Sequence, residues 1–337
     1  MHVINISQTE RVVKMAKRKR RRKLKTSVKI TALVLIVIIA FSGYLYYKIQ
    51  QMRSYTEPEG TITDTNPKDN EGENGKISPI GGDEEEEEET SLLTYKVYDL
   101  EQGEAILVKT DEKVVLIDTG SKKSKKELVK KVEEDTAGEI DYLIFTADDP
   151  DKLGGMKAIK KNFTVKHIIY GDLGKNEEKV LKIFKDSEIL DEKETTIDIG
   201  YSATVMTLMP KSRSTDKNDR SIICNVSYGD TYFWSMSNAG AAEEKKLVDI
   251  IDESISVFVP ARRGDDTTNY ILNVTEPTFV AIPLNRGDKV SEQFLNRCSS
   301  GEIYDTQKCG DLTFESDKNT VSMRDYEKLS EENNLAK

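Results

Sequence analysis

The chain has 337 residues, 37% hydrophobic and 33% charged, and its formal net charge is −10. This length allows two average domains, or one large domain with accessory segments. The charge is uneven: residues 1–50 hold twelve Lys/Arg and one acid, residues 51–92 hold three basic and thirteen acidic residues, and residues 93–337 carry a net −11. An acidic folded part argues against a DNA-binding body, which needs a basic face. Three cysteines are too few for a disulfide scaffold, and two histidines exclude most His-based zinc sites.

Residues 30–47 are predicted to form one transmembrane helix. They are eighteen residues without a charge, close to the roughly 20 that span a bilayer, and tyrosines stand at their outer end. Nine Lys/Arg lie between residues 17 and 29, so the positive-inside rule places a basic tail, residues 1–29, in the cytoplasm. The predicted location is therefore the cell membrane, single-pass, with the folded domain extracellular. A cleaved signal peptide is the alternative. Contact of the tail with anionic lipid is favoured over nucleic-acid or partner binding.

Residues 48–92 are predicted to be a disordered acidic linker. They have no apolar periodicity from residue 53 onward, and they end in an unbroken glutamate run, Glu84 to Glu89. Such a segment cannot bury enough apolar surface to offset its ordering entropy, and its like charges extend it. A solvated spacer is favoured, with calcium or a basic partner as the alternative ligand.

Residues 93–325 alternate strand-like and helix-like stretches, which predicts one layered α/β domain followed by a C-terminal tail, residues 326–337. Helices are predicted over 123–134, 153–162, 177–185, 241–251, 290–297 and around Tyr270. Strands are predicted over 94–98, 105–108, 114–117, 141–145, 165–170, 203–209, 221–227, 231–235, 256–259, 278–282, 302–304, 312–315 and 320–323.

Six motifs in this domain follow the order and spacing of a known family. Residues 97–107 (VYDLEQGEAIL) resemble its D-V-G-Q-G-D-A opening, 115–120 (VLIDTG) its L-I-D-T-G, and 146–155 (TADDPDKLGG) its T-H-x-D-x-D-H-x-G-G. Residues 221–238 follow its strand pair ending in T-G-D, 259–264 (VPARRG) stand at its P-H-H-G, and 285–289 (NRGDK) at its N-x-x-G-H. The chain thus resembles the ComEC-type metallo-β-lactamase-fold domains. The resemblance implies a four-layer αβ/βα sandwich with a zinc site on loops at one edge, and it implies fold more strongly than function.

The positions that the resemblance assigns to metal ligands hold unsuitable residues. The first metal histidine is Ala147, the closing one is Lys152, and the last is Lys289. Asn238 replaces the bridging aspartate, and Arg262 or Arg263 replaces the histidine of the later motif, while Asp149 and Asp151 are kept. Zinc needs neutral imidazoles or anionic ligands and an open position for water. The site is therefore predicted to be degenerate, without a cofactor.

Three interpretations of these residues remain open. The favoured one is that Lys152, Arg262, Arg263 and Lys289 pair with Asp149 and Asp151 where the metal would lie, with at least one of the four within salt-bridge distance. Alternatively, Asp149 and Asp151, with Asp118 and Asp148, hold a hard cation such as Ca²⁺ or Mg²⁺. Thirdly, Arg262 and Arg263 recruit an anionic ligand, because guanidinium groups bind phosphate or carboxylate in two-pronged fashion.

Other catalytic motifs are missing from the sequence. Ser235, Ser237 and Ser254 have no histidine base nearby in the pattern, since His167 reads as an ordinary strand residue, and no phosphate-binding glycine loop occurs. Cys224 reads as a buried apolar residue. Cys298 and Cys309 are eleven residues apart, which predicts a disulfide in an exported domain, with free thiols as the alternative.

The sequence therefore predicts a membrane-anchored extracellular pseudo-enzyme with a binding or scaffolding role toward a protein or cell-surface partner. No nucleic acid is expected on the folded domain. The alternative is a metal-dependent hydrolase or nuclease of the ComEC-like family that uses the residual carboxylates Asp149 and Asp151. A purely structural domain is the third possibility.

Overall fold

A computed structural model describes residues 91–190, 194–208, 218–248, 251 and 253–329. They belong to one compact unit, Glu84–Lys337. The predicted basic tail, transmembrane helix and nearly all of the acidic linker lie outside the described residues. Within the described part of the chain, no helix has the length and apolarity needed to cross a membrane.

The described residues form two β-sheets. The first sheet has eight strands in the order β15-β14-β1-β2-β3-β4-β5-β6. Its strands are β1 (Leu93–Val97), β2 (Ile106–Lys109), β3 (Val114–Ile117), β4 (Glu139–Phe145), β5 (Thr164–Tyr170), β6 (Glu188–Leu190), β14 (Leu312–Ser316) and β15 (Val321–Met323). The second sheet has seven strands in the order β13-β12-β11-β10-β9-β8-β7. These are β7 (Thr195–Asp198), β8 (Thr204–Leu208), β9 (Ile223–Tyr228), β10 (Thr231–Ser235), β11 (Val257–Val259), β12 (Phe279–Ile282) and β13 (Glu302–Asp305).

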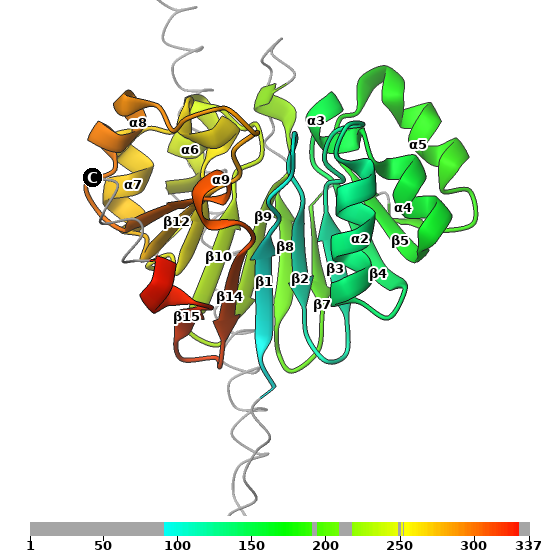
Figure 1. Cartoon of the computed structure of the whole chain (residues 1–337), viewed down its shortest axis with the longest axis horizontal. Coiled ribbons are helices and arrows are strands. Elements are labelled where there is room, and N and C mark those ends of the chain that lie inside the picture. Colours follow the sequence, from blue (N-terminus) through cyan, green and yellow to red (C-terminus); the bar gives the residue numbers. More distant parts are fainter. Residues whose placement is uncertain (1–90, 191–193, 209–217, 249–250, 252, 330–337) are drawn as a thin grey trace, which may run out of the picture. The chain divides into compact units, whose positions relative to one another are not determined.

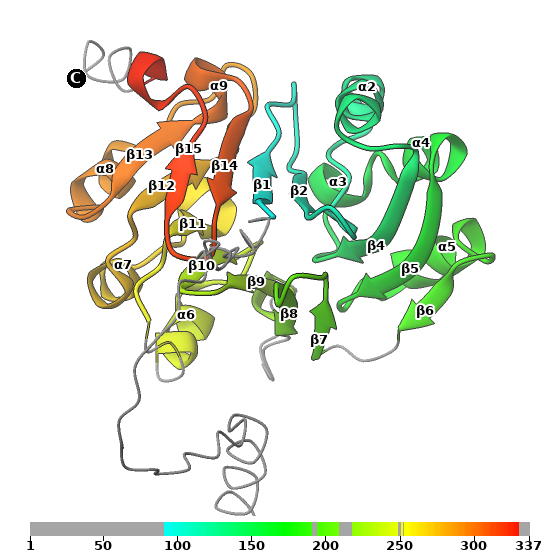
Figure 2. The same cartoon turned by 90° about the horizontal axis from the view of Figure 1, so that it is seen from below.

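Helices cover the outer face of each sheet, so the domain has four layers (Figures 1 and 2). The first sheet is covered by α2 (Lys125–Asp135), α4 (Met156–Asn162) and α5 (Glu177–Ile183), and the second by α6 (Ala241–Val248), α7 (Asn269–Thr275) and α8 (Glu292–Arg297). Strand alternation explains the layers, because Val115 and Ile117 face the core between the sheets while Leu116 faces the helices. Tyr95 stacks on Phe233 across that core, with ring centroids 5.0 Å apart. The predicted four-layer α/β sandwich is confirmed.

Most predicted elements are found within a few residues of their expected bounds, but one predicted helix is divided. Residues 153–162 were expected to be one helix, whereas α3 (Pro150–Leu153) and α4 are separated by two glycines. A Cβ on Gly154 would lie 2.2 Å from the amide nitrogen of Lys122, and one on Gly155 would lie 2.2 Å from the carbonyl oxygen of Thr119. The glycine pair therefore allows the loop after β3 to pack directly against this turn.

Short elements at the edges were not predicted. β6 and β7 are short strands at the ends of the two sheets, and α9 (Thr306–Cys309) is a single turn. At the other end of the chain, Leu329 is only 7% exposed and belongs to the core between the sheets. The folded domain thus continues beyond residue 325 into the segment that was expected to be a tail.

The parallel strands determine where the site residues meet. β3 and β4 are parallel neighbours in the first sheet, and β10, β11 and β12 are parallel neighbours in the second. The carboxyl ends of parallel neighbours lie at the same edge of a sheet. Asp118 follows β3, residues 146–152 follow β4, and residues 236–238, 260–264 and 283–289 follow the three strands of the second sheet.

Candidate functional site

A buried lysine lies at the centre of this edge. Lys152, in α3, is 2% exposed, and its Nζ lies 2.9 Å from Glu104 Oε2 and 3.2 Å from Asp118 Oδ2. Burial lowers the pKa of this ammonium, but the two carboxylates outweigh burial, and the net effect raises the pKa above its ordinary value. Lys152 is therefore a fixed positive charge inside the site.

Asp118 links this lysine to both sheets. It adopts a φ of +61°, directly after β3, and its Oδ1 accepts a hydrogen bond from the backbone N–H of Thr146 at 2.9 Å. The Thr146 hydroxyl donates to the other carboxylate oxygen and accepts from Ser237 Oγ at 2.6 Å. Burial raises the pKa of Asp118 to about 6, with Lys152 acting against burial and Glu104 adding to it.

Asp149 begins α3 and contacts the second sheet's loops. One carboxylate oxygen accepts from the backbone N–H of Asp151 at 2.9 Å, and Pro150 occupies the first helical position. This arrangement is an ordinary helix N-cap. The other oxygen accepts from Asn238 Nδ2 at 2.8 Å. Asn238 thus presents its amide nitrogen, a donor, to the carboxylate.

Asp151 forms the ion pair that the sequence predicted. Arg263 Nη2 lies 3.3 Å from Asp151 Oδ2, and it also donates to Asn285 Oδ1 at 3.0 Å. The other Asp151 oxygen accepts from Gln102 Nε2 at 2.8 Å. Arg263 adopts a φ of +61°, and its Nε donates to the carbonyl of Pro283 at 3.1 Å. The prediction of a cation beside Asp149 or Asp151 is confirmed for Arg263, whereas Lys152 pairs with Asp118 and Glu104 instead.

The remaining predicted residues are placed differently. Ala147 is buried and offers only a methyl group. Arg262 pairs with Asp266 at 2.7 Å, at the protein surface. Lys289 is exposed and forms no ion pair with any described residue. The interpretation that all four cations pair with Asp149 and Asp151 therefore holds only for Arg263, and it is wrong for Lys152, Arg262 and Lys289.

A small polar cavity of about 180 Å³ lies among these groups. It is lined by Glu104, Asp149, Asp151, Lys152, Asn238, Arg262, Arg263 and Asp265. Asp148 lies apart, where it accepts from Asn176 Nδ2 at 2.6 Å. The carboxylates at 118, 148, 149 and 151 thus each have their own protein donor. Among the described residues, no group of three or more His, Cys, Asp and Glu side chains is arranged to hold a metal ion.

The sequence reasoning missed four contributors to the site. Glu104 and Gln102 lie in the loop between β1 and β2, Thr146 follows β4, and Asn285 follows β12. The signal for Glu104 and Gln102 was present, because they flank Gly103 in the motif at residues 97–107. Gly103 has a φ of +97°, its Cβ position would lie 2.4 Å from the carbonyl oxygen of Asp151, and its N–H donates to Asn285 Oδ1 at 2.8 Å.

His167 and the cysteines lie outside the site. His167 is on β5, where it stacks on Tyr142 at 4.8 Å, as expected of a strand residue. All three cysteines are free, so the Cys298–Cys309 disulfide was predicted wrongly. Cys298 packs on the helix-covered face of the second sheet and Cys309 on the core between the sheets, so the two thiols lie on opposite sides of the sheet.

Three solved structures illustrate what this chain is similar to. The metallo-β-lactamase fold protein YhfI from Bacillus subtilis has a TM-score of 0.49 and 11% identity, over 67% of this chain and 100% of that one. Tm1679, a metal-dependent hydrolase of the β-lactamase superfamily, has a TM-score of 0.44 and 15% identity, over 63% of this chain and 95% of that one. A diphosphatase from the PhnP family has a TM-score of 0.41 and 15% identity, over 66% of this chain and 98% of that one. No curated protein sequence matched the chain.

Similarity at these scores and identities says nothing about activity. A family match is more specific, because it covers several loops that carry the site residues. Residues 98–210 match the Metallo-beta-lactamase superfamily. That segment contains Glu104, Asp118 and the loop from Thr146 to Lys152, and its strands belong to both sheets. This part of the chain is therefore similar to the Metallo-beta-lactamase superfamily.

Proposed function

We propose that the chain is a membrane-anchored pseudo-enzyme, a degenerate relative of the ComEC-type domains that acts outside the cell by binding a partner. One observation carries the proposal: the ammonium group of Lys152 is buried between Glu104 and Asp118, at 2.9 and 3.2 Å. A cation thus stands where the resemblance expects a metal-binding histidine. It already offsets part of the negative charge of the two carboxylates around it.

The residues around the cavity do not fit zinc. A zinc site needs several imidazole, thiolate or carboxylate ligands facing one point, with one position open for water. Here the side chain of Ala147 has no ligand atom, and Asn238 turns its N–H donor toward Asp149. Arg263 forms an ion pair with Asp151. A divalent ion beside Lys152 and Arg263 would be repelled by two positive charges. The proposal therefore includes no metal-dependent step.

Metal analysis of the purified full chain tests this proposal. We expect far less than one zinc per chain after dialysis, both from cells grown with added zinc and after incubation of the protein with zinc. Phosphodiesterase and lactonase assays are expected to show no zinc-dependent turnover. One or two tightly held zinc ions per chain would contradict the proposal, as would turnover that Asp149→Asn abolishes.

The second candidate is a hydrolase or nuclease that uses the remaining carboxylates. The observation in its favour is that Asp149 and Asp151 both line the polar cavity of about 180 Å³. Their oxygens are engaged by Asn238, Arg263 and Gln102, and such engagement favours a structural role. The same assays separate the two candidates, with Mg²⁺, Mn²⁺ and Ca²⁺ added in turn.

Membrane anchoring is a separate part of the proposal and has its own test. It is supported by the eighteen uncharged residues at 30–47 and the nine Lys/Arg that precede them. Protease added to intact cells is expected to remove the folded domain and leave a short membrane-bound stub. Complete protection of the domain until the membrane is opened would contradict the proposed topology.

A further inference from the structure

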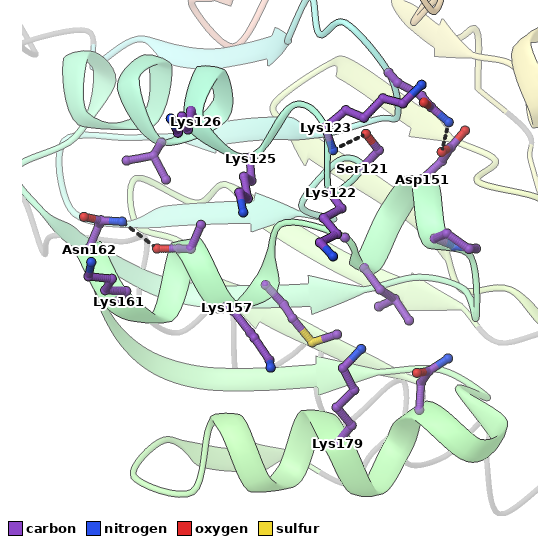
Figure 3. A pocket seen from close by; sticks show the side chains of 18 residues that line it. Ser121, Lys122, Lys123, Lys125, Lys126, Asp151, Lys157, Lys161, Asn162 and Lys179 are labelled. Carbon is purple, nitrogen blue, oxygen red and sulfur yellow. Dashed lines mark hydrogen bonds between the residues drawn. The ribbon is translucent and has the colours of Figure 1, made fainter.

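A lysine-lined groove lies on the outer face of the first sheet, among the helices α2, α4 and α5 (Figure 3). Its volume is about 940 Å³, within the range of ligand-binding sites. Seven lysines surround it: Lys122, Lys123, Lys125, Lys126, Lys157, Lys161 and Lys179. This concentration of positive charge stands out, because residues 93–337 as a whole carry a net −11.

These lysines are not balanced by acids. None of the seven forms an ion pair with a described residue, and the single carboxylate that lines the groove, Asp151, is held by Arg263 and Gln102. Lys125 and Lys126 stand in the first turn of α2, where positive charge opposes the helix dipole. Lys157 and Lys161 are four residues apart on α4 and repel each other. These lysines therefore repel one another, and a bound anion would reduce that repulsion.

The distribution of the lysines indicates an extended ligand. The ammonium groups come from the loop before α2 and from three helices, and they surround the groove rather than converging on one point (Figure 3). Lysine ammoniums bind phosphates as separate point charges, whereas arginine is preferred for planar two-pronged contacts. No arginine is among the described residues that line the groove. Several phosphates spaced along a chain match this pattern better than a single phosphate or a carboxylate.

The floor of the groove narrows the chemistry further. Val129, Leu153 and Met156 give it an apolar surface, and lysine stems add methylene groups. The described lining includes no aromatic ring, and sequence-tolerant binding of single-stranded nucleic acid depends on aromatic stacking. We infer that this groove binds a linear phosphodiester polymer with short aliphatic linkers, of the polyol phosphate type. Its phosphates lie against the lysines and its carbon units lie on the apolar floor.

The inference deepens the proposed binding function by naming the class of partner. The two proposals can fail separately. Bound zinc would contradict the pseudo-enzyme proposal without affecting the inference about the groove. A groove that binds no phosphodiester polymer would contradict this inference and leave the pseudo-enzyme proposal unchanged. The groove also adjoins the polar cavity, because Asp151 lines both.

Lysine footprinting on the full chain tests the inference residue by residue. An amine-reactive reagent is applied with and without a synthetic glycerol phosphate oligomer, and the modified lysines are identified by mass spectrometry. We expect protection at Lys125, Lys157, Lys161 and Lys179, and none at Lys130 or Lys245, which are exposed and lie outside the groove. Protection confined to the basic residues 1–29 would overturn the inference.

Affinity measurements then separate the ligand classes. A Lys157→Gln/Lys161→Gln variant is expected to bind the oligomer at least tenfold more weakly, with a smaller slope of log affinity against log salt. The control Lys130→Gln/Lys245→Gln makes the same change in net charge and is expected to bind as the unmodified chain does.

Inorganic polyphosphate and oligothymidylate with the same number of charges are the comparison ligands, and both are expected to bind more weakly than the glycerol phosphate oligomer. Tightest binding of oligothymidylate would overturn the inference and assign the groove to nucleic acid. Equal affinity for all three, or affinity that the groove variant does not change, would also overturn it.

Discussion

Two neighbouring regions of this domain use lysine in opposite ways. At the sheet edge, Lys152 is 2% exposed and pairs with Glu104 and Asp118. In the groove beside it, seven lysines form no ion pair with any described residue. A buried charge must have a partner, because leaving it alone in the interior is costly, whereas an exposed charge is free to meet a ligand. The difference separates a charge that maintains the fold from charges available for binding.

Replacing the buried lysine should have the largest effect. Lys152→Met leaves Glu104 and Asp118 buried without their cation, so we expect a loss of about 3–5 kcal/mol in the free energy of unfolding. Urea denaturation measures it. The matched change in the groove, Lys157→Met, is expected to stay within about 0.5 kcal/mol of the unmodified chain. Equal losses from both variants would remove the contrast between the two regions.

The pH dependence of stability sharpens the same contrast. Burial raises the pKa of Asp118 to about 6 in the folded domain, above its value of about 3.9 in an unfolded chain. Between these values the folded state binds more protons, so the free energy of unfolding falls as pH rises from about 4 to 6, by at most about 3 kcal/mol. Unfolding curves at pH 4.5 and 7 are expected to show this decline.

Asp118→Asn is the control for that titration. The variant should lose Asp118's share of the decline and keep the part due to Glu244, whose buried carboxyl has its pKa raised to about 7. An unchanged difference between the two pH values in Asp118→Asn would contradict the assignment.

Breaking the outer ion pair should cost least. Asp151 and Arg263 have side chains that are 24% and 27% exposed, so water screens their attraction. We expect Asp151→Ala to lower the free energy of unfolding by about 1–2 kcal/mol, because Gln102 also loses its acceptor. Added zinc should not change the result. A loss as large as that of Lys152→Met would place Asp151 in the buried part of the network.

The fold was more predictable from sequence than the contacts within the site. Long apolar strands such as β4 and the ordered motifs specify the sandwich, because burial of their side chains leaves few other arrangements. Short strands such as β6 have half-exposed, mixed residues and give little periodic signal. The motif at 146–155 predicted that cations replace the metal. It could not tell that Lys152 and Asp151, adjacent in α3, face different partners.

The ion pair between Lys152 and Glu104 could not be predicted from the sequence, for a physical reason. Glu104 comes from a loop 48 residues earlier, and only the close approach of Gly103 to Asp151 brings it to the lysine. A side chain's direction within a single turn of helix depends on that packing, which no local pattern records. The exposed lysines posed the converse problem, since they are scattered over 58 positions, 122 to 179, and meet only when α2, α4 and α5 pack together.

The pairing of β1 with β14 has a consequence for biosynthesis. Leu93 lies opposite Ser316. More than 200 residues must therefore be synthesised after β1 before β14, its second neighbour in the sheet, is available for pairing. Until then β1 exposes an unpaired edge, and such edges attract other chains. Chains that terminate before residue 312 should therefore aggregate or be degraded rather than persist as half-domains. Folding that depends on contacts between such distant residues is also expected to be slow. We therefore expect the domain to reach its native state only after the chain is complete.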